Sequence, residues 1–135
     1  MLQPKTVILT DALACRSINS LATTVQITDT GISPGSGVGN DRGELSEKTL
    51  GVKTVCIGVP MVIDTRTLVR DALENCPNID KNEIDSIVSA LYPANGSYVC
   101  PKDADTAVDE MARLVGYAIN KSFHRSLSYE EMMYM

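Results

Sequence analysis

The chain has 135 residues, the length of one domain, and is long enough to bury a hydrophobic core. Hydrophobic residues make up 44% and charged residues 21% of it, a balance that excludes a disordered chain. The net charge is −5 and no basic cluster occurs, which argues against a protein that binds nucleic-acid phosphates. The apolar runs stay well below the ~20 residues of a membrane-spanning helix, and the first residues lack the apolar core of a signal peptide. We therefore expect a cytoplasmic protein.

The cysteines do not form a recognisable metal or disulfide pattern. His124 is the only histidine, and no C-x-x-C pair occurs, so a zinc site is not expected. We expect free thiols, no metal and no cofactor, as is usual in a reducing compartment. We expect His124 to be an exposed helix residue rather than a catalytic base. The four cysteines are Cys15, Cys56, Cys76 and Cys100.

The N-terminal part of the chain predicts strands that alternate with a helix. Continuous apolar residues predict a buried strand over Lys5–Thr10, and the apolar residues of Ala12–Leu21 have helical spacing. The segment Thr23–Thr28 is rich in β-branched residues and predicts a second strand. From Asp29 to Gly43 the glycine content excludes regular structure and predicts a loop.

The C-terminal part predicts one further strand and three helices. Lys53–Val59 predicts the strand, and the three residues after Pro60 either continue it or start a short neighbour. Asp64 is placed to cap the next helix, and a D-x-x-E capping box at Asp80 opens another. The last helix begins near Pro101 and carries an apolar stripe at helical spacing. Together these elements predict one α/β domain.

Asp11 is the first candidate for chemistry, because it stands where the first strand is expected to give way to a helix. Open α/β sheets bind ligands at the carboxyl ends of their strands. A carboxylate among apolar residues at that place can serve as an acid near neutral pH, because desolvation disfavours its charged form. The alternative is that Asp11 only caps the helix that follows.

Asp29 is the second candidate and opens the tripeptide Asp29-Thr30-Gly31 after the second strand. In pepsin-like proteases the same three residue types hold one of two aspartates that share a proton. Ile32 stands where that motif has a small residue, so we do not assign a pepsin-like fold. The alternative is that Asp29 closes a turn at the end of the strand.

The stretch Pro34–Asn40 is the most distinctive in the chain because glycine occupies alternate positions. Backbone N–H groups of such a loop can converge on an anion, an oxyanion or a substrate carboxylate. The spacing fits neither a P-loop nor a dinucleotide-binding loop. The alternative is a structural loop that passes close to another part of the backbone. The candidates for substrate binding are Gly35, Ser36, Gly37, Gly39 and Asn40.

Four stretches of the chain match one pattern. They read T-D-A-L-A at Thr10–Ala14, T-T-V-Q-I-T-D-T-G-I-S-P-G-S-G-V-G-N at Thr23–Asn40 and L-G-V-K-T-V-C-I-G-V-P-M-V-I-D at Leu50–Asp64. The fourth begins at Val99–Asp105 and ends at Ser122–His124, the two ends of the last helix. The pattern resembles the germination proteases of spore-forming bacteria, endopeptidases that degrade small acid-soluble spore proteins.

This resemblance implies a three-layer α/β sandwich with a mostly parallel sheet, like that of hydrogenase-maturation endopeptidases and phosphorylase/hydrolase-like proteins. Residues 1–135 would form a single α/β domain that corresponds to the C-terminal portion of a germination protease. The resemblance also implies a site of two aspartates, in which Asp11 takes the place of the second. The first lies well upstream in the family, and ten residues precede Asp11 here, so we expect the upstream half to be absent.

The resemblance implies an aspartic-type endopeptidase of the spore core that acts on small acid-soluble spore proteins. We expect a homo-oligomer without direct contact to nucleic acid or membrane. Three possibilities are open for the missing aspartate: the chain is a fragment that is inactive alone, Asp29 supplies the second acid, or the chain is a non-catalytic relative that binds or assembles. A metal-dependent amidase is a further alternative, which the single histidine disfavours.

Overall fold

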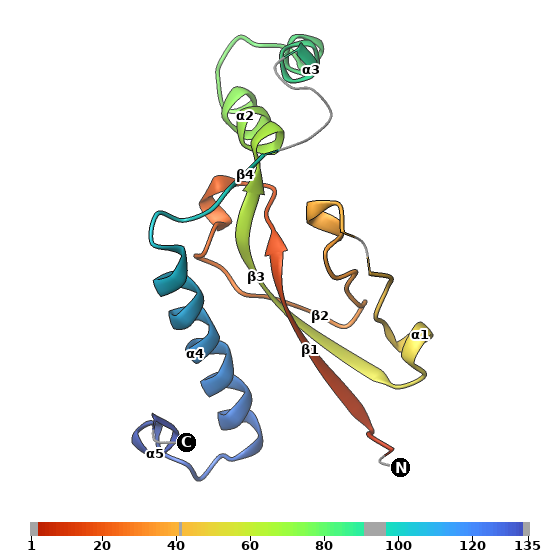
Figure 1. Ribbon diagram of the computed structural model, residues 1–135, viewed down its shortest axis with the longest axis vertical. Coiled ribbons are helices and arrows are strands. Elements are labelled where there is room, and N and C mark those ends of the chain that lie inside the picture. The colour runs from red at the N-terminus through yellow and green to blue at the C-terminus, as the bar shows by residue number, and fades with distance from the viewer. Residues whose placement is uncertain (1–2, 41, 91–96, 134–135) are drawn as a thin grey trace. The chain divides into compact units, whose positions relative to one another are not determined.

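A computed structural model describes residues 3–40, 42–90 and 97–133, in two compact units that span residues 1–102 and 103–135. The first unit is built on a sheet and the second on helices (Figure 1). No helix in the described ranges is long and apolar enough to cross a membrane. The single domain expected over the whole chain stays a prediction.

The sheet of the first unit has four strands and is mixed. Its central strand is β3 (Lys53–Asp64), with β1 (Thr6–Ala14) parallel on one side and β2 (Gln26–Thr28) antiparallel on the other. The short strand β4 (Tyr98–Val99) pairs antiparallel with the end of β3. The predicted α/β class is confirmed, but the mostly parallel sheet is wrong. The chain returns from β1 to β2 without the long crossover that a parallel neighbour requires, so β2 runs in the opposite direction.

The predicted helix over Ala12–Leu21 does not form. β1 continues through Ala14, and only a short 3₁₀ helix, η1 (Ile18–Ser20), follows it. Alanine and leucine favour a helix only weakly, whereas pairing with β3 gives the same residues a full ladder of hydrogen bonds. Cys15 extends this pairing, because its N–H donates to the carbonyl of Val62 at 2.9 Å.

The central strand β3 holds most of the core of the first unit, because it is flanked on both sides. The strand continues through Pro60, but its register with β1 changes there. Leu13 lies opposite Pro60 and Ala14 lies opposite Val62, so Met61 is the extra residue of a β-bulge. Its buried apolar residues include Cys56, Val59, Pro60, Met61 and Ile63.

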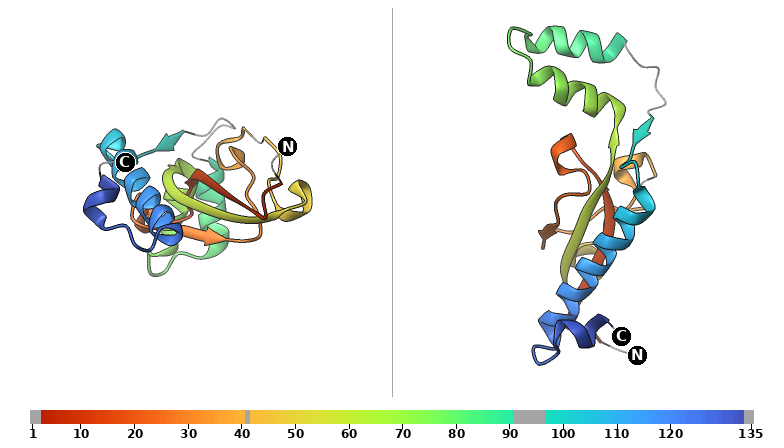
Figure 2. Two further views of the ribbon diagram at one scale, coloured as in Figure 1. Left: turned by 90° about the horizontal axis from the view of Figure 1, so that it is seen from below. Right: turned by 90° about the vertical axis from the view of Figure 1, so that its left-hand side faces the viewer.

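Two helices follow β3 and lie side by side (Figure 2). Asp64 caps α2 (Thr65–Glu74), because its carboxylate accepts from the N–H groups of the second and third residues of the helix at 3.0 and 3.2 Å. Asp80 accepts in the same way at the start of α3 (Lys81–Ala90). Both aspartates are confirmed as N-caps, and the return bond of the Glu83 side chain that completes a capping box stays a prediction. The face of α3 that packs inward carries the buried Ile84 and Val88.

The second unit consists of α4 (Ala104–Phe123) and α5 (Tyr129–Met133). α4 begins three residues after Pro101, close to its predicted start. The turn between the helices is held by the rings of Tyr117 and Tyr129, which lie edge to face with centroids 5.1 Å apart. None of the α4 residues is fully buried, including those of the predicted apolar stripe.

Candidate active site

A small pocket lies between the end of β1 and the glycine-rich loop that follows β2. Its volume is about 150 Å³. One wall is formed by Asp11–Ala14 of β1, and the other by Ser33 and Gly35–Val38. The loop side contains a second 3₁₀ helix, η2 (Ser36–Val38), which is the short orange coil beside the tip of β1 (Figure 1). The fold therefore brings together two motifs that are nearly twenty residues apart in the sequence.

Of the residues that the structure describes, Asp11 supplies the only ionisable side chain of this pocket. It is half-buried, and its backbone lies opposite Gly58 of β3. Within the described ranges its carboxylate accepts no hydrogen bond and forms no ion pair. Asp11 lies inside β1 and the next helix, η1, begins only at Ile18, so the alternative that Asp11 is a helix cap is wrong. A carboxylate without a protein partner at the wall of a pocket is free to exchange a proton with a bound water or substrate.

The glycine-rich loop is folded tightly upon itself. A Cβ atom at Gly35, which has a φ of 78°, would overlap the carbonyl oxygen of Asn40. The amides of Ser36, Val38, Gly39 and Asn40 donate to carbonyl groups of the same loop at 2.9–3.3 Å. These amides are therefore already used within the loop. The loop shapes the wall of the pocket more than it offers a set of free donors.

The predicted substrate-binding residues divide into two groups. Gly35, Ser36 and Gly37 line the pocket, whereas Gly39 and Asn40 do not. Gly37 lies against β1, and a Cβ atom there would come within 2.6 Å of the Cβ of Ala14. The sequence left two alternatives for this loop, a binding loop and a structural loop that passes close to another part of the backbone. In the structure the loop both lines the pocket and lies close to the backbone of β1.

Gly58 of β3 lies next to the site in the sheet, and it was not among the predicted site residues. It lies opposite Asp11 in the register of the sheet. A Cβ atom at Gly58 would overlap the side chain of Leu13, which lies across it. A glycine inside an apolar strand often indicates such a close approach, and this signal was present in the sequence.

Asp29 lies on the other side of β3 from Asp11. It follows β2 directly, is exposed, and is not part of the pocket. Thr28 lies opposite Cys56, while Asp11 lies opposite Gly58. Two strand spacings across and two residues along the sheet put the Cα atoms of Asp11 and Thr28 about 12 Å apart. The structure thus does not bring the two candidate acids together.

The Asp29-Thr30-Gly31 segment is instead a turn closed by a neighbouring side chain. The hydroxyl of Thr28 accepts from the N–H of Thr30 at 3.1 Å. Gly31 has a φ of 97°, and this lets Ile32 pair with Leu45 further along the chain. The turn alternative therefore describes this segment, with threonine rather than aspartate closing it.

Asp71 of α2 fixes the chain immediately after the site and was missed in the sequence. Its carboxylate accepts from the hydroxyl of Ser17 at 3.0 Å and from the N–H of Ile18 at 3.1 Å. These bonds hold η1, and through it the end of β1, to the helix. No local sequence signal pairs Asp71 with a turn that lies more than fifty residues earlier.

The cysteines are free thiols, as predicted. Burial raises the pKa of both Cys15 and Cys56, so these two thiols stay protonated and unreactive at neutral pH. Cys76 and Cys100 are exposed. In the described part of the chain, no three side chains of the metal-ligating types gather closely enough to hold an ion.

Comparison with known proteins assigns this arrangement to a protein family. A family model described as germination protease matches residues 1–77. More than half of the chain lies within that match. The chain belongs to the germination protease family.

Individual germination proteases align with almost the whole chain. The protein from Clostridium tetani is 34% identical over 151 aligned positions, which cover 97% of this chain and 47% of the relative. The protein from Bacillus pumilus is 31% identical over 182 positions, covering 96% of this chain and 48% of the relative. A third, from Caldanaerobacter subterraneus, is 35% identical and covers 96% and 46%. The chain thus spans about half the length of the germination proteases it matches.

The match to the germination protease family model includes every residue of the pocket. It extends from β1 through the glycine-rich loop and β3 to the end of α2. Asp71 and Gly58 also lie within it. His124, the exposed residue at the C-terminal end of α4, lies outside it. The candidate site is therefore part of the segment that defines membership of the germination protease family.

Proposed function

We propose that this chain carries part of the active site of an aspartic-type endopeptidase that degrades small acid-soluble spore proteins in the spore core. Asp11 is the catalytic residue in this proposal. The observation that carries it is the unpartnered, half-buried carboxylate of Asp11 at the wall of a pocket inside the family-matched segment. Protease activity is the function that the relatives' name, germination protease, gives to those proteins.

Hydrolysis of a peptide bond by carboxylates requires a base and an acid. A carboxylate takes a proton from water as the water oxygen attacks the peptide carbonyl carbon, and a proton must then reach the leaving amine as the C–N bond breaks. Asp11 can perform the first step. Because Asp29 lies on the far side of β3, we propose that the second carboxylate comes from outside the described pocket rather than from Asp29.

A second candidate function rests on a different observation. Among the described residues Asp11 is the only ionisable one that lines the pocket, so these residues offer one carboxylate where the chemistry uses two. We propose as the alternative a non-catalytic binding or assembly module of the same family.

The test is intact-mass spectrometry of a small acid-soluble spore protein after incubation with the purified chain. Discrete cleavage products that decrease at least a hundredfold in Asp11→Asn are expected if Asp11 is a catalytic acid or base. Asp29→Asn is the matched control and should retain full activity. Loss of cleavage in Asp29→Asn would restore Asp29 as the second acid. No cleavage by a folded wild-type chain that still binds the spore protein would favour the binding module.

A further inference from the structure

Three of the described residues that line the pocket have polar side chains. They are Asp11 with its carboxylate, and Ser33 and Ser36 with their hydroxyl groups. The remaining lining residues are alanine, leucine, glycine and valine, whose side chains form no hydrogen bonds. A water molecule that binds Asp11 in this pocket therefore finds its second side-chain partner in a serine.

The pocket has room for a water molecule between its two walls. Its volume of about 150 Å³ is several times the roughly 10–15 Å³ that one water needs. The walls converge at one end, because a Cβ atom at Gly37 would lie 2.6 Å from the Cβ of Ala14. In a pocket that narrows in this way, one water can bind Asp11 on the strand wall and a hydroxyl group on the loop wall at the same time.

The backbone of Ser33 is held on both sides. Ile32 before it exchanges two backbone hydrogen bonds with Leu45, at 2.9 and 2.7 Å. Pro34 after it restricts the residue that precedes a proline to an extended conformation. The carbonyl of Ser33 also accepts from the N–H of Ser36 at 3.1 Å. A hydroxyl group on so constrained a residue can hold a water molecule at one place.

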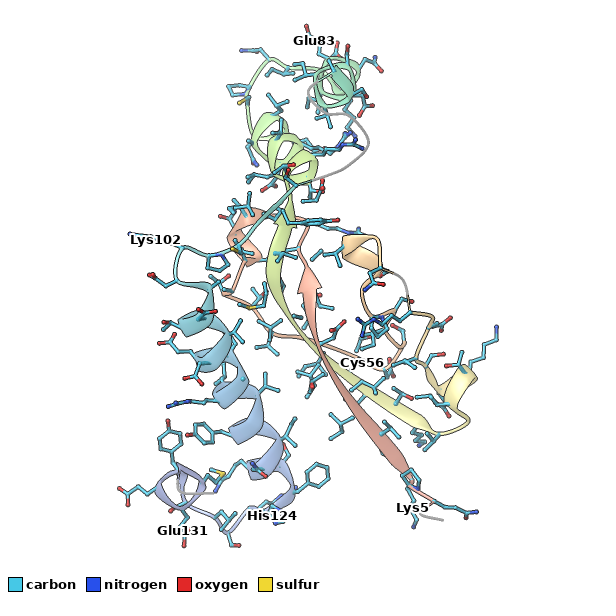
Figure 3. The ribbon with its side chains drawn as sticks, viewed as in Figure 1. Lys5, Cys56, Glu83, Lys102, His124 and Glu131 are labelled. Carbon is cyan, nitrogen blue, oxygen red and sulfur yellow. The ribbon has the colours of Figure 1, made fainter. Side chains whose placement is uncertain are left out.

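The loop is also packed against the central strand just before Ser33. Cys56, labelled in Figure 3, is buried in β3. Burial raises the pKa of its thiol, and the backbone N–H of Gly31 partly offsets this rise by a hydrogen bond. A Cβ atom at Gly31 would lie 2.6 Å from the Cβ of Ser46. The loop is therefore fixed to β3 two residues before Ser33.

Of the two serines, Ser33 is the better placed to hold a water. Ser33 is half-buried, as Asp11 is, whereas Ser36 is exposed. A hydrogen bond is stronger where bulk water is excluded, so the half-buried hydroxyl group should bind the water more firmly.

We propose that Ser33 is a positioning residue that holds the hydrolytic water together with Asp11. This inference rests on the function proposed above. The water donates one hydrogen to the carboxylate of Asp11 and the other to the hydroxyl oxygen of Ser33, which leaves a lone pair for the peptide carbonyl carbon. As the O–C bond forms, the proton moves to Asp11 and the π electrons of the C=O bond move to the carbonyl oxygen. Ser33 keeps its own proton throughout.

The kinetic test measures initial rates of cleavage of a small acid-soluble spore protein by intact-mass spectrometry at several substrate concentrations. Ser33→Ala should lower kcat about threefold to tenfold, the range for one net hydrogen bond, and change KM less than about twofold. Ser33→Thr keeps a hydroxyl group and should recover at least about half of the wild-type kcat. Ser20→Ala is the matched control and should keep the wild-type kcat, because Ser20 is a half-buried serine of η1 that does not line the pocket.

A high-resolution crystal structure of the unaltered chain tests the geometry without relying on activity. One ordered water should lie within about 2.6–3.2 Å of both a carboxylate oxygen of Asp11 and the hydroxyl oxygen of Ser33. This water should be lost in Ser33→Ala and present in Ser33→Thr. If Ser33→Ala does not fold, the position of the water in the unaltered chain still decides the question.

Three results would overturn the inference. One is a direct hydrogen bond between Ser33 and Asp11 with no water between them. Another is a water that binds Asp11 through Ser36, or that stays in place in Ser33→Ala. The third is an unchanged kcat in Ser33→Ala while the wild-type chain cleaves. The two proposals can fail separately, because absence of cleavage by the wild-type chain counts against the proposed function, whereas the crystal structure decides the bridging water in either case.

Discussion

Replacing Gly37 by alanine should destabilise the protein and deform the pocket. The added Cβ would lie 2.6 Å from the Cβ of Ala14, whereas carbon atoms in contact prefer about 3.5–4.0 Å. The loop must therefore move away from β1 by about 1 Å, and overpacking of this size costs about 1–3 kcal/mol. The same movement widens the gap between Gly37 and Ala14, so cleavage should also decline.

Urea unfolding followed by circular dichroism measures this effect. A loss of 2 kcal/mol with a slope of about 2 kcal/mol per molar urea lowers the unfolding midpoint by about 1 M. Gly116→Ala is the matched control, since nothing lies within 4 Å of its Cβ position in the middle of α4. This second replacement should stabilise by up to about 1 kcal/mol, because alanine favours a helix over glycine.

A double-mutant cycle with Ala14→Gly separates the contact from other effects. Ala14→Gly removes the clashing Cβ and by itself costs about 0.5–1 kcal/mol. The Gly37→Ala/Ala14→Gly double variant should therefore lose at least about 1 kcal/mol less than the sum of the two single variants. A neutral or stabilising Gly37→Ala, or strictly additive single variants, would refute the close packing of the loop against β1.

Three further predictions concern the first unit. Asp71→Ala should lower the unfolding free energy by about 1–3 kcal/mol in urea titrations, since two hydrogen bonds to η1 are lost. Burial raises the pKa of the Cys15 thiol in the folded state, so folding favours the protonated thiol. This contribution to the free energy of unfolding is complete at neutral pH and is lost as the pH rises above the ordinary pKa of a thiol. In urea titrations, Cys15→Ala should therefore reduce the fall in the free energy of unfolding above about pH 8.5. Ile27 is 70% exposed on β2, and if the chain self-associates through it, as the expected oligomer suggests, Ile27→Ser should shift sedimentation velocity toward the monomer. An unchanged sedimentation profile would place self-association elsewhere.

The parts of the fold that depend on local signals could be predicted from the sequence. Asp64 and Asp80 cap their helices as their positions before amphipathic segments indicated. The apolar run of β3 was also visible, because a central strand is buried on both faces. The helix expected at Ala12–Leu21 failed, since its residues have pairing partners more than forty residues away that no local pattern reveals.

The candidate site, too, could be predicted from the sequence only in its local parts. Asp11 and the glycine-rich loop were each found in the sequence, but their meeting in one pocket is a consequence of tertiary structure. The separation of Asp29 from Asp11 follows from the position of β3 between them, and strand order cannot be read from composition or spacing. The contact of Gly37 with Ala14 likewise depends on how the loop folds back over β1.

The bulge in β3 makes that strand tolerant of a change in length at one place. Near the start of β3 the buried residues Thr54 and Cys56 have even numbers, Gly58–Met61 are all buried around the bulge, and beyond it the buried Ile63 has an odd number. The extra residue shifts the alternation of inward and outward side chains by one position, so both halves of the strand present their apolar residues to the same face. Deletion of Met61 would give a regular strand in which Ile63 still faces the core. A deletion inside either half would move the apolar side chains of part of the strand to the opposite face of the sheet. Homologues that differ in length within this strand should therefore carry the difference at the bulge.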